Sequence, residues 1–166
     1  MDGGAAQEFT EFVSARGRAL LRTAYALTGS QHAAEDLVQT ALAKAMLRWS
    51  RLHGDAEPYV RRIMYNEFVS LWRWRRRRAE VLTADPPERG VSTGEDTVLR
   101  VAVRAALGTL PPRQRAVLVL RYLEDLSERE VADLLGVSPG TVASQASRAL
   151  ATLRGSMPEL DGVEAR

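Results

Sequence analysis

Residues 127–154 carry the feature that most constrains this chain, because they predict two short helices joined by a tight turn. Ser127 and Glu130 have the spacing of a capping box at the start of the first helix. Gly136 is suited to end that helix, since glycine adopts left-handed dihedral angles without strain. Ser138 predicts the cap of the second helix, with Pro139 in its first turn. This pattern is typical of a helix-turn-helix that enters a DNA major groove. An ordinary helical hairpin inside a bundle is the alternative.

The second of these helices has distinct inner and outer faces. Its apolar positions predict an inward face made of Val142, Ala146, Ala149, Leu150 and Leu153. Small polar side chains and one arginine occupy the outer face, which is the face that would meet duplex DNA. The candidate duplex contacts are Ser138, Thr141, Ser144, Gln145 and Arg148, with Arg113 and Arg115 before the motif for contacts to the phosphate backbone.

Composition excludes several classes of function. The 166 residues contain no cysteine, so disulfides, thiolate metal sites and cysteine nucleophiles are excluded. No run of eighteen apolar residues predicts a membrane span, and the first residues do not resemble a secretory signal. His32 and His53 are isolated in the sequence, and the serines of the helix-turn-helix have no neighbouring histidine. We therefore expect no catalytic residue, metal or cofactor, and no membrane insertion.

Apolar residues recur at helical spacing along most of the chain, which predicts an all-α protein. Three helices over 8–28, 31–49 and 56–78 form the first packed unit. Residues 79–95 have no apolar period and are rich in proline, glycine and acidic residues, which indicates a flexible linker. We therefore predict two small helical domains, residues 1–78 and 96–155, that move independently. Residues 156–166 form a short tail.

The third helix is strongly basic at its end. Residues 61–78 contain seven arginines and a single acid. Tyr59, Arg62, Asn66 and Arg73 lie close to one stripe, and they offer a ring for stacking, an amide for a base edge and cations for phosphates, as melted DNA requires. Further basic and aromatic residues at the helix end are candidate phosphate or stacking contacts: Trp74, Arg75, Arg76 and Arg77. The alternative is a solvated basic helix end, with Tyr59 as a partly buried ring of the core.

Four motifs in order resemble those of bacterial sigma factors of the extracytoplasmic-function type. They are A-E-D-L-V-Q-T at 34–40, E-P-Y-V-R-R-I-M-Y-N-E-F at 57–68, L-P-P-R-Q-R-A-V-L-V-L-R-Y-L-E-D-L-S at 110–127 and G-V-S-P-G-T-V at 136–142. Chain length and the arginine and alanine bias are similar to an actinobacterial sigma-E-like subfamily. The sequence departs from the family at Tyr59, which usually is tryptophan, and at Ala143 and Gln145, which stand where the family commonly has cations.

The resemblance implies a cytoplasmic, non-catalytic subunit of RNA polymerase with two DNA-reading domains. The first domain would open and hold the −10 promoter element, and the second would bind the −35 element as duplex. The resemblance also implies that Asp36, Gln39 and Thr40 face the polymerase core. The implied partners are the clamp and flap regions of the core, promoter DNA and an anti-sigma factor. Two other readings of the residues stay open: a free-standing helix-turn-helix regulator, and an RNA-binding protein that uses the arginine-rich helix.

Overall fold

The computed structural model describes residues 3–79 and 98–157 of the chain. These residues form seven α-helices, one 3-10 turn and one π-helical turn, and the described ranges contain no β-strand. The all-α prediction is confirmed. The predicted linker, apart from Ala79, and nearly all of the predicted tail lie outside the described residues.

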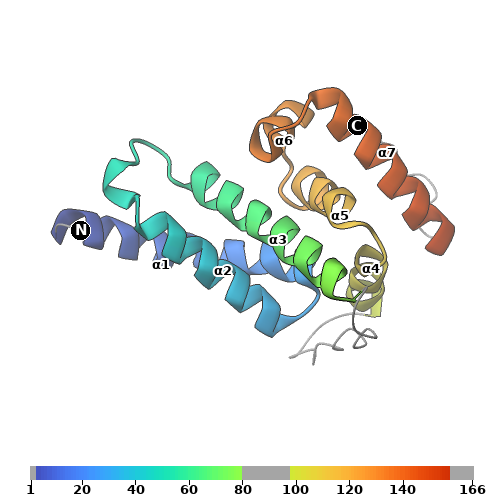
Figure 1. Ribbon diagram of the computed structural model, residues 1–166, viewed down its shortest axis with the longest axis horizontal. Helices are drawn as coiled ribbons and strands as arrows, with labels where there is room; N and C mark the ends of the chain where they lie inside the picture. The colour runs from blue at the N-terminus through green and yellow to red at the C-terminus, as the bar shows by residue number, and fades with distance from the viewer. Residues whose placement is uncertain (1–2, 80–97, 158–166) are drawn as a thin grey trace.

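The N-terminal domain is a bundle of three helices: α1 (Gly3–Thr28), α2 (Gln31–Met46) and α3 (Glu57–Ala79). The turn between α1 and α2 uses Gly29 at φ +72°, a left-handed conformation that suits glycine. Ser30 then caps α2 by accepting a hydrogen bond from the Ala33 N–H at 3.4 Å. Because this connection is short, α1 and α2 pack side by side, and α3 lies along α2 (Figure 1).

The second predicted helix ends earlier than expected. It stops at Met46, and Trp49 belongs to a separate 3-10 turn, η1 (Trp49–Arg51). Trp49 is nevertheless buried, with its ring centroid 5.0 Å from that of Phe9 and 5.1 Å from that of Phe12. Aromatic packing thus closes the open end of the hairpin.

The C-terminal domain contains α4 (Val98–Gly108), α5 (Pro112–Leu118), the π-helical turn η2 (Val119–Leu123), α6 (Glu128–Leu135) and α7 (Pro139–Ser156). The predicted capping box is confirmed: Ser127 accepts from the Glu130 N–H at 3.2 Å, and Glu130 accepts from the Ser127 N–H at 2.7 Å. Gly136 has φ +68°, and Ser138 caps α7. The helix-turn-helix is therefore α6–α7, and its predicted inward residues are buried.

The two domains share an interface, which was not expected from the sequence. Helix α3 packs against α5 and α6, while α1 contacts α4, α5 and η2 (Figure 1). One apolar cluster joins Leu27 and Phe68 of the first domain to Ala116, Leu120 and Val131 of the second. In this conformation the domains are packed together, so the expectation of two independent bodies does not describe it.

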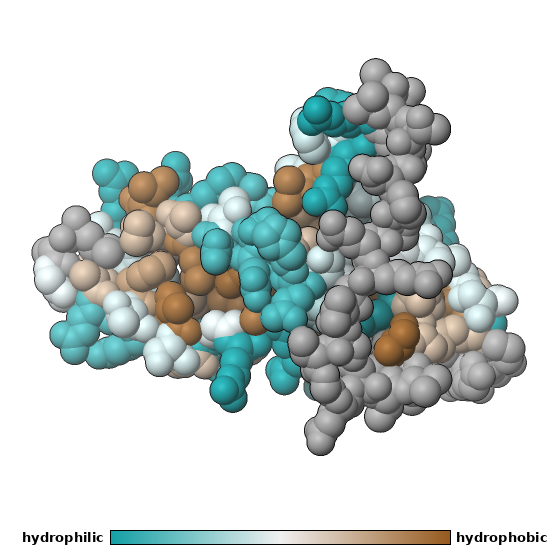
Figure 2. All heavy atoms as spheres, turned by 90° about the horizontal axis from the view of Figure 1, so that it is seen from below, coloured by the Kyte–Doolittle hydropathy of each residue, from teal (hydrophilic) through white to brown (hydrophobic). Residues whose placement is uncertain are grey.

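Apolar residues also reach the surface. Figure 2 shows hydrophobic residues interspersed with hydrophilic ones on one face of the molecule. Met46, Leu47 and Leu71 are among the exposed large apolar residues of the first domain, and Tyr122 and Leu123 are among those of the second. Apolar residues scattered singly among polar ones are normal on a protein surface and do not by themselves indicate a partner.

Candidate nucleic-acid interface

The first turns of α7 carry the residues expected to read duplex DNA. The Ser138 and Thr141 hydroxyl oxygens lie 2.9 Å apart, and the Ser144 hydroxyl donates to the Thr141 carbonyl at 3.1 Å. These hydroxyls therefore already hold the start of the helix in place. Gln145 is half-buried and Arg148 is exposed, and neither side chain has a hydrogen bond to another described residue. Their amide and guanidinium groups are the ones suited to base edges and phosphates.

The stripe expected to hold melted DNA lies on the side of α3 that faces the C-terminal domain. Tyr59 is half-buried and packs against the apolar core, so its ring has the structural role that the sequence left open. Arg62 donates to the Asp133 carbonyl of α6 at 2.7 Å. Asn66 and Arg73 are exposed. The structure thus brings all four side chains to one face of α3 but covers part of that face.

The two predicted DNA surfaces lie opposite each other. A cleft of about 200 Å³ separates them. Its polar lining comprises Asn66, Ser70 and Arg73 from α3 and Arg113, Thr141 and Gln145 from the C-terminal domain. The apolar periodicity of the sequence does not predict that these two surfaces face each other, because their arrangement depends on how the domains pack.

The arginine-rich end of α3 divides between two faces. Trp74 is 54% exposed, and the Arg78 guanidinium lies 4.9 Å from its ring centroid, as in a cation–π pair. Arg73 and Arg77 are exposed, whereas the side chain of Arg76 lies outside the described part of the chain. Arg75 lies on the α2 side of the helix, where it lines a cavity with the residues expected to face polymerase. Arg75 is exposed, so its predicted contact with the phosphate backbone stays a prediction.

Arg115 is not a surface residue, and its predicted role as a DNA contact is wrong in this conformation. Its side chain is buried and donates to the Leu27 carbonyl at 2.7 Å and to the Gly108 and Leu110 carbonyls, each at 3.0 Å. Burial lowers the pKa of this guanidinium from its usual value. Arg113, two residues earlier, is exposed, and its predicted contact with the phosphate backbone stays a prediction.

The residues expected to face polymerase lie together. Asp36, Gln39 and Thr40 are exposed on α2 and line a cavity of about 390 Å³. Leu71, Trp72 and Arg75 of α3 also line this cavity. The surface therefore combines an acid, amide and hydroxyl groups with apolar and basic neighbours, a composition suited to a protein partner.

Two family matches cover most of the chain. Residues 12–78 match the family described as Sigma-70 region 2, and residues 100–153 match Sigma-70, region 4. The chain belongs to the sigma-70 family. Each of its two helical domains thus corresponds to one region of a sigma factor, and the match with region 4 contains the helix-turn-helix.

Named relatives place this sigma factor within the family. It is 42% identical to the RNA polymerase sigma-E factor of Streptomyces coelicolor over 91% of its own length and 86% of the relative's. It is 35% identical to the ECF RNA polymerase sigma factor SigE of Mycolicibacterium smegmatis over 92% of its length and 63% of the relative's. These relatives support an actinobacterial sigma-E-like factor of the extracytoplasmic-function type.

A solved structure shows the same fold. The sigma factor RpoE of Bartonella quintana, in complex with the anti-sigma factor NepR, matches with a TM-score of 0.77 and 26% identity. The match covers 95% of the present sigma factor and 99% of that chain. The regulator alternative is not favoured by any of these relatives.

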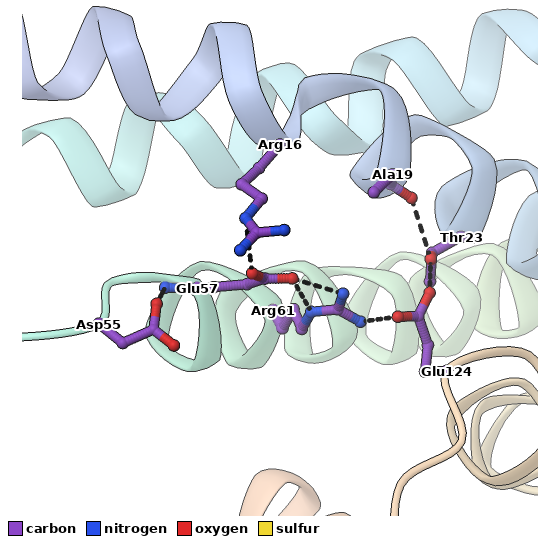
Figure 3. A network of polar contacts seen from close by, with 7 residues as sticks. All are labelled: Arg16, Ala19, Thr23, Asp55, Glu57, Arg61 and Glu124. Carbon is purple, nitrogen blue, oxygen red and sulfur yellow. Dashed lines mark hydrogen bonds and ion pairs between the residues drawn. The ribbon is translucent and has the colours of Figure 1, made fainter.

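A polar network that sequence reasoning missed joins the two domains of the sigma factor (Figure 3). Arg61 of α3 forms ion pairs with Glu57, one turn earlier, and with Glu124, which follows η2. Burial opposes the charge of Arg61, but its hydrogen bonds to the two glutamates raise its pKa overall. The i, i+4 spacing of Glu57 and Arg61 could have been seen in the sequence. The partner Glu124 could not.

Residues 3–79 and 98–157 contain no cluster of three or more histidine or acidic side chains that could hold a metal ion. His32 instead lies 3.6 Å from the Asp36 carboxylate on the surface of α2. None of the described helices is both long and apolar enough to cross a membrane.

Proposed function

We propose that this sigma factor directs the RNA polymerase core to specific promoters and helps open the −10 region. The observation that carries the proposal is the presence of two differently built surfaces on two domains. Gln145 and Arg148 on α7 suit base edges and phosphates in a major groove. Asn66 and Arg73 on α3 suit an unpaired strand.

The same proposal assigns the α2 surface to the polymerase clamp. Asp36, Gln39 and Thr40 are exposed together, away from the face of α3 that lines the cleft with α7. A sigma factor can then hold core and DNA at once. Chemistry stays with the core enzyme in the cytoplasm, and the sigma factor supplies binding energy and strand separation. The complex of the related RpoE with an anti-sigma factor supports an anti-sigma partner here as well.

The decisive experiment combines co-purification with run-off transcription. The purified chain, mixed with core polymerase, is expected to co-elute with it and to start transcripts from a subset of promoters that core alone ignores. A free-standing regulator would instead bind an operator duplex without core and start no transcript. Sequencing the transcripts that appear on overexpression would supply the promoters for this test.

A further inference from the structure

Glu124 connects the C-terminal domain to two helices of the N-terminal domain (Figure 3). Its carboxylate accepts hydrogen bonds from the Arg61 guanidinium of α3 and from the Thr23 hydroxyl of α1. The Glu124 and Arg61 side chains are only 10% and 13% exposed, and Thr23 is fully buried. We call Glu124, Arg61 and Thr23 the interdomain latch.

Contacts within the N-terminal domain orient Arg61 independently of Glu124. Glu57 accepts from Arg61 Nε at 3.0 Å and from Nη2 at 2.6 Å, and Arg16 of α1 lies 3.0 Å from the other Glu57 oxygen. Arg61 is therefore oriented by its own domain, with one nitrogen left to meet Glu124. Removing one partner from such a shielded pair is far more costly than breaking an exposed surface pair, because the other charge stays buried.

The interface next to the latch covers part of the surface proposed for single-stranded DNA. Arg62, one residue beyond Arg61, is bonded to the Asp133 carbonyl of α6. Glu130 and Asp133 of α6 line a cavity of about 590 Å³ together with Tyr59 and Arg62. An acidic helix thus lies where the phosphates of a bound strand would lie, and Arg62 already donates to an oxygen of that helix.

The duplex surface is restricted by the same packing. Thr141 and Gln145 face Asn66 and Arg73 across the cleft of about 200 Å³, which is far too small for a DNA double helix. The positions −10 and −35 place the two elements about 25 base pairs apart. At about 3.4 Å per base pair, this is roughly 85 Å along B-form DNA. Two surfaces that face each other across such a cleft cannot read both elements, so the domains must separate before promoter binding.

We propose that the interdomain latch holds the free sigma factor in an autoinhibited conformation, in which α6 covers part of the single-strand surface of α3 and α7 faces the rest across a narrow cleft. The proposal rests on the proposed function, since it uses the DNA surfaces assigned there. A DNA phosphate can take the place of the Asp133 carbonyl as the partner of Arg62. It cannot take the place of Glu124, because Arg61 and Thr23 lie outside the DNA stripe. Glu124 therefore determines how readily the chain opens.

Substitution of Glu124 tests the latch in the full chain without polymerase. Because the chain has no cysteine, the exposed positions Ala15 and Ala151 can be changed to cysteine and spin-labelled in every variant. Glu124→Ala is expected to shift the distance distribution between the labels to longer values. It should also raise the affinity of the free chain for a −35 duplex about tenfold, because apparent affinity scales with the fraction of open molecules.

Matched variants make the result specific. Asp125→Asn is the control, because Asp125 is exposed, neighbours Glu124 and has φ 52°, a conformation that asparagine tolerates. Thr23→Val removes the latch hydroxyl from the other domain and should shift distances and affinity in the same direction as Glu124→Ala. It provides the test if Glu124→Ala loses its helical circular dichroism.

The outcomes separate the latch from the proposed function. Unchanged distances in both latch variants would overturn the latch, and longer distances without tighter duplex binding would overturn its inhibitory role. Run-off transcription by the wild-type chain with core polymerase tests the proposed function separately. If the wild-type chain starts no transcript, the proposed function fails but the distance measurement still tests the latch. If it does start transcripts, the latch is still overturned when its variants behave like Asp125→Asn.

Discussion

At the scale of single residues, position in the fold decides what each arginine does. Arg113 and Arg115 are two residues apart at the start of α5, yet one is exposed and the other is buried under three backbone carbonyls. Helical geometry explains the difference, because neighbours two positions apart point in nearly opposite directions. Arg115 therefore stabilises the interface, while Arg113 is available to a phosphate.

We expect Arg115→Met to lower the free energy of unfolding by about 2–3 kcal/mol, because the three carbonyls lose their donor in a buried site. Urea denaturation at neutral pH measures the change. Arg113→Met is the matched control and should stay within about 0.5 kcal/mol of wild type. Equal effects of the two substitutions would contradict the structural role of Arg115.

A charge reversal on α2 tests the polymerase surface. Asp36 is exposed, so Asp36→Arg should leave the helical fold intact while it weakens binding to core polymerase through the reversed charge. Fluorescence titration of labelled chain with core measures the affinity, and circular dichroism checks the fold. Glu8→Arg, at an exposed position on α1, controls for net charge. An unchanged affinity of the Asp36 variant would place the core-binding surface elsewhere.

At the scale of elements, short-range capping defines the helix-turn-helix. The pKa of Glu130 is lowered chiefly by its hydrogen bond with the Ser127 backbone. The hydrogen bond with the Ser127 side chain lowers it further. A carboxylate whose pKa is lowered by folding stabilises the folded state above its unfolded pKa, near 4.5, and loses that contribution as pH falls through the folded value. The start of α6 should therefore weaken in acid.

Glu130→Gln isolates the charge, because glutamine can still accept the hydrogen bond from Ser127. We expect the variant to be less stable than wild type at pH 7 and equally stable below the folded pKa of Glu130. Thermal unfolding across this pH range measures the convergence. Glu8→Gln serves as the control, since Glu8 caps no helix. A constant difference at all pH values would show that the charge of Glu130 is not responsible.

Substitutions in the two DNA-reading helices, α7 and α3, should impair different steps of initiation. Gln145→Ala is expected to weaken binding of the polymerase complex to a −35 duplex by about 1–3 kcal/mol, as a lost base contact does. Asn66→Ala should leave that binding intact and reduce strand opening, because its contacts form only with an unpaired base. Duplex titration and permanganate reactivity near −10 distinguish the steps.

Ser147→Ala, exposed on another part of α7, is the control for both assays. Equal losses of duplex affinity in the Gln145 and Asn66 variants, with opening unaffected, would contradict this division and favour a simple regulator.

At the scale of the whole molecule, both apolar and polar contacts join the two domains. It combines a shared apolar cluster, the Arg115 bond to Leu27 and the interdomain latch. A chain held this way keeps its two DNA surfaces facing each other, where neither can bind its promoter element, until a partner separates the domains. Binding of core polymerase would then have to favour the open state by more than this interface favours the closed one.

Proteolysis provides a test at this scale. The composition of residues 79–95 predicts preferred cleavage there. We expect the two resulting fragments to stay together in gel filtration at micromolar concentration, because the interface does not depend on the covalent link. Fragments of the Glu124→Ala chain should separate more readily, while those of Asp125→Asn should behave like wild type. Wild-type fragments that elute separately would show that the linker alone keeps the domains close.

The sequence alone determined the existence of the helices, their caps and the helix-turn-helix, although α2 ends at Met46, before the predicted residue 49. Ser127, Gly136 and Ser138 are read correctly because capping depends on residues three or four positions away. Apolar periodicity likewise predicted the buried face of α7. Region assignments followed from motifs that are themselves local.

Only the tertiary structure decided which surfaces meet. Glu124 finds Arg61 across 63 residues and Thr23 across 101, and such separations leave no periodic trace in a sequence. For the same reason Arg115 was misassigned: an arginine looks the same in sequence whether its partner is a phosphate or three buried carbonyls. Local free energies select the helices, whereas burial and charge pairing between distant segments select how the helices face one another.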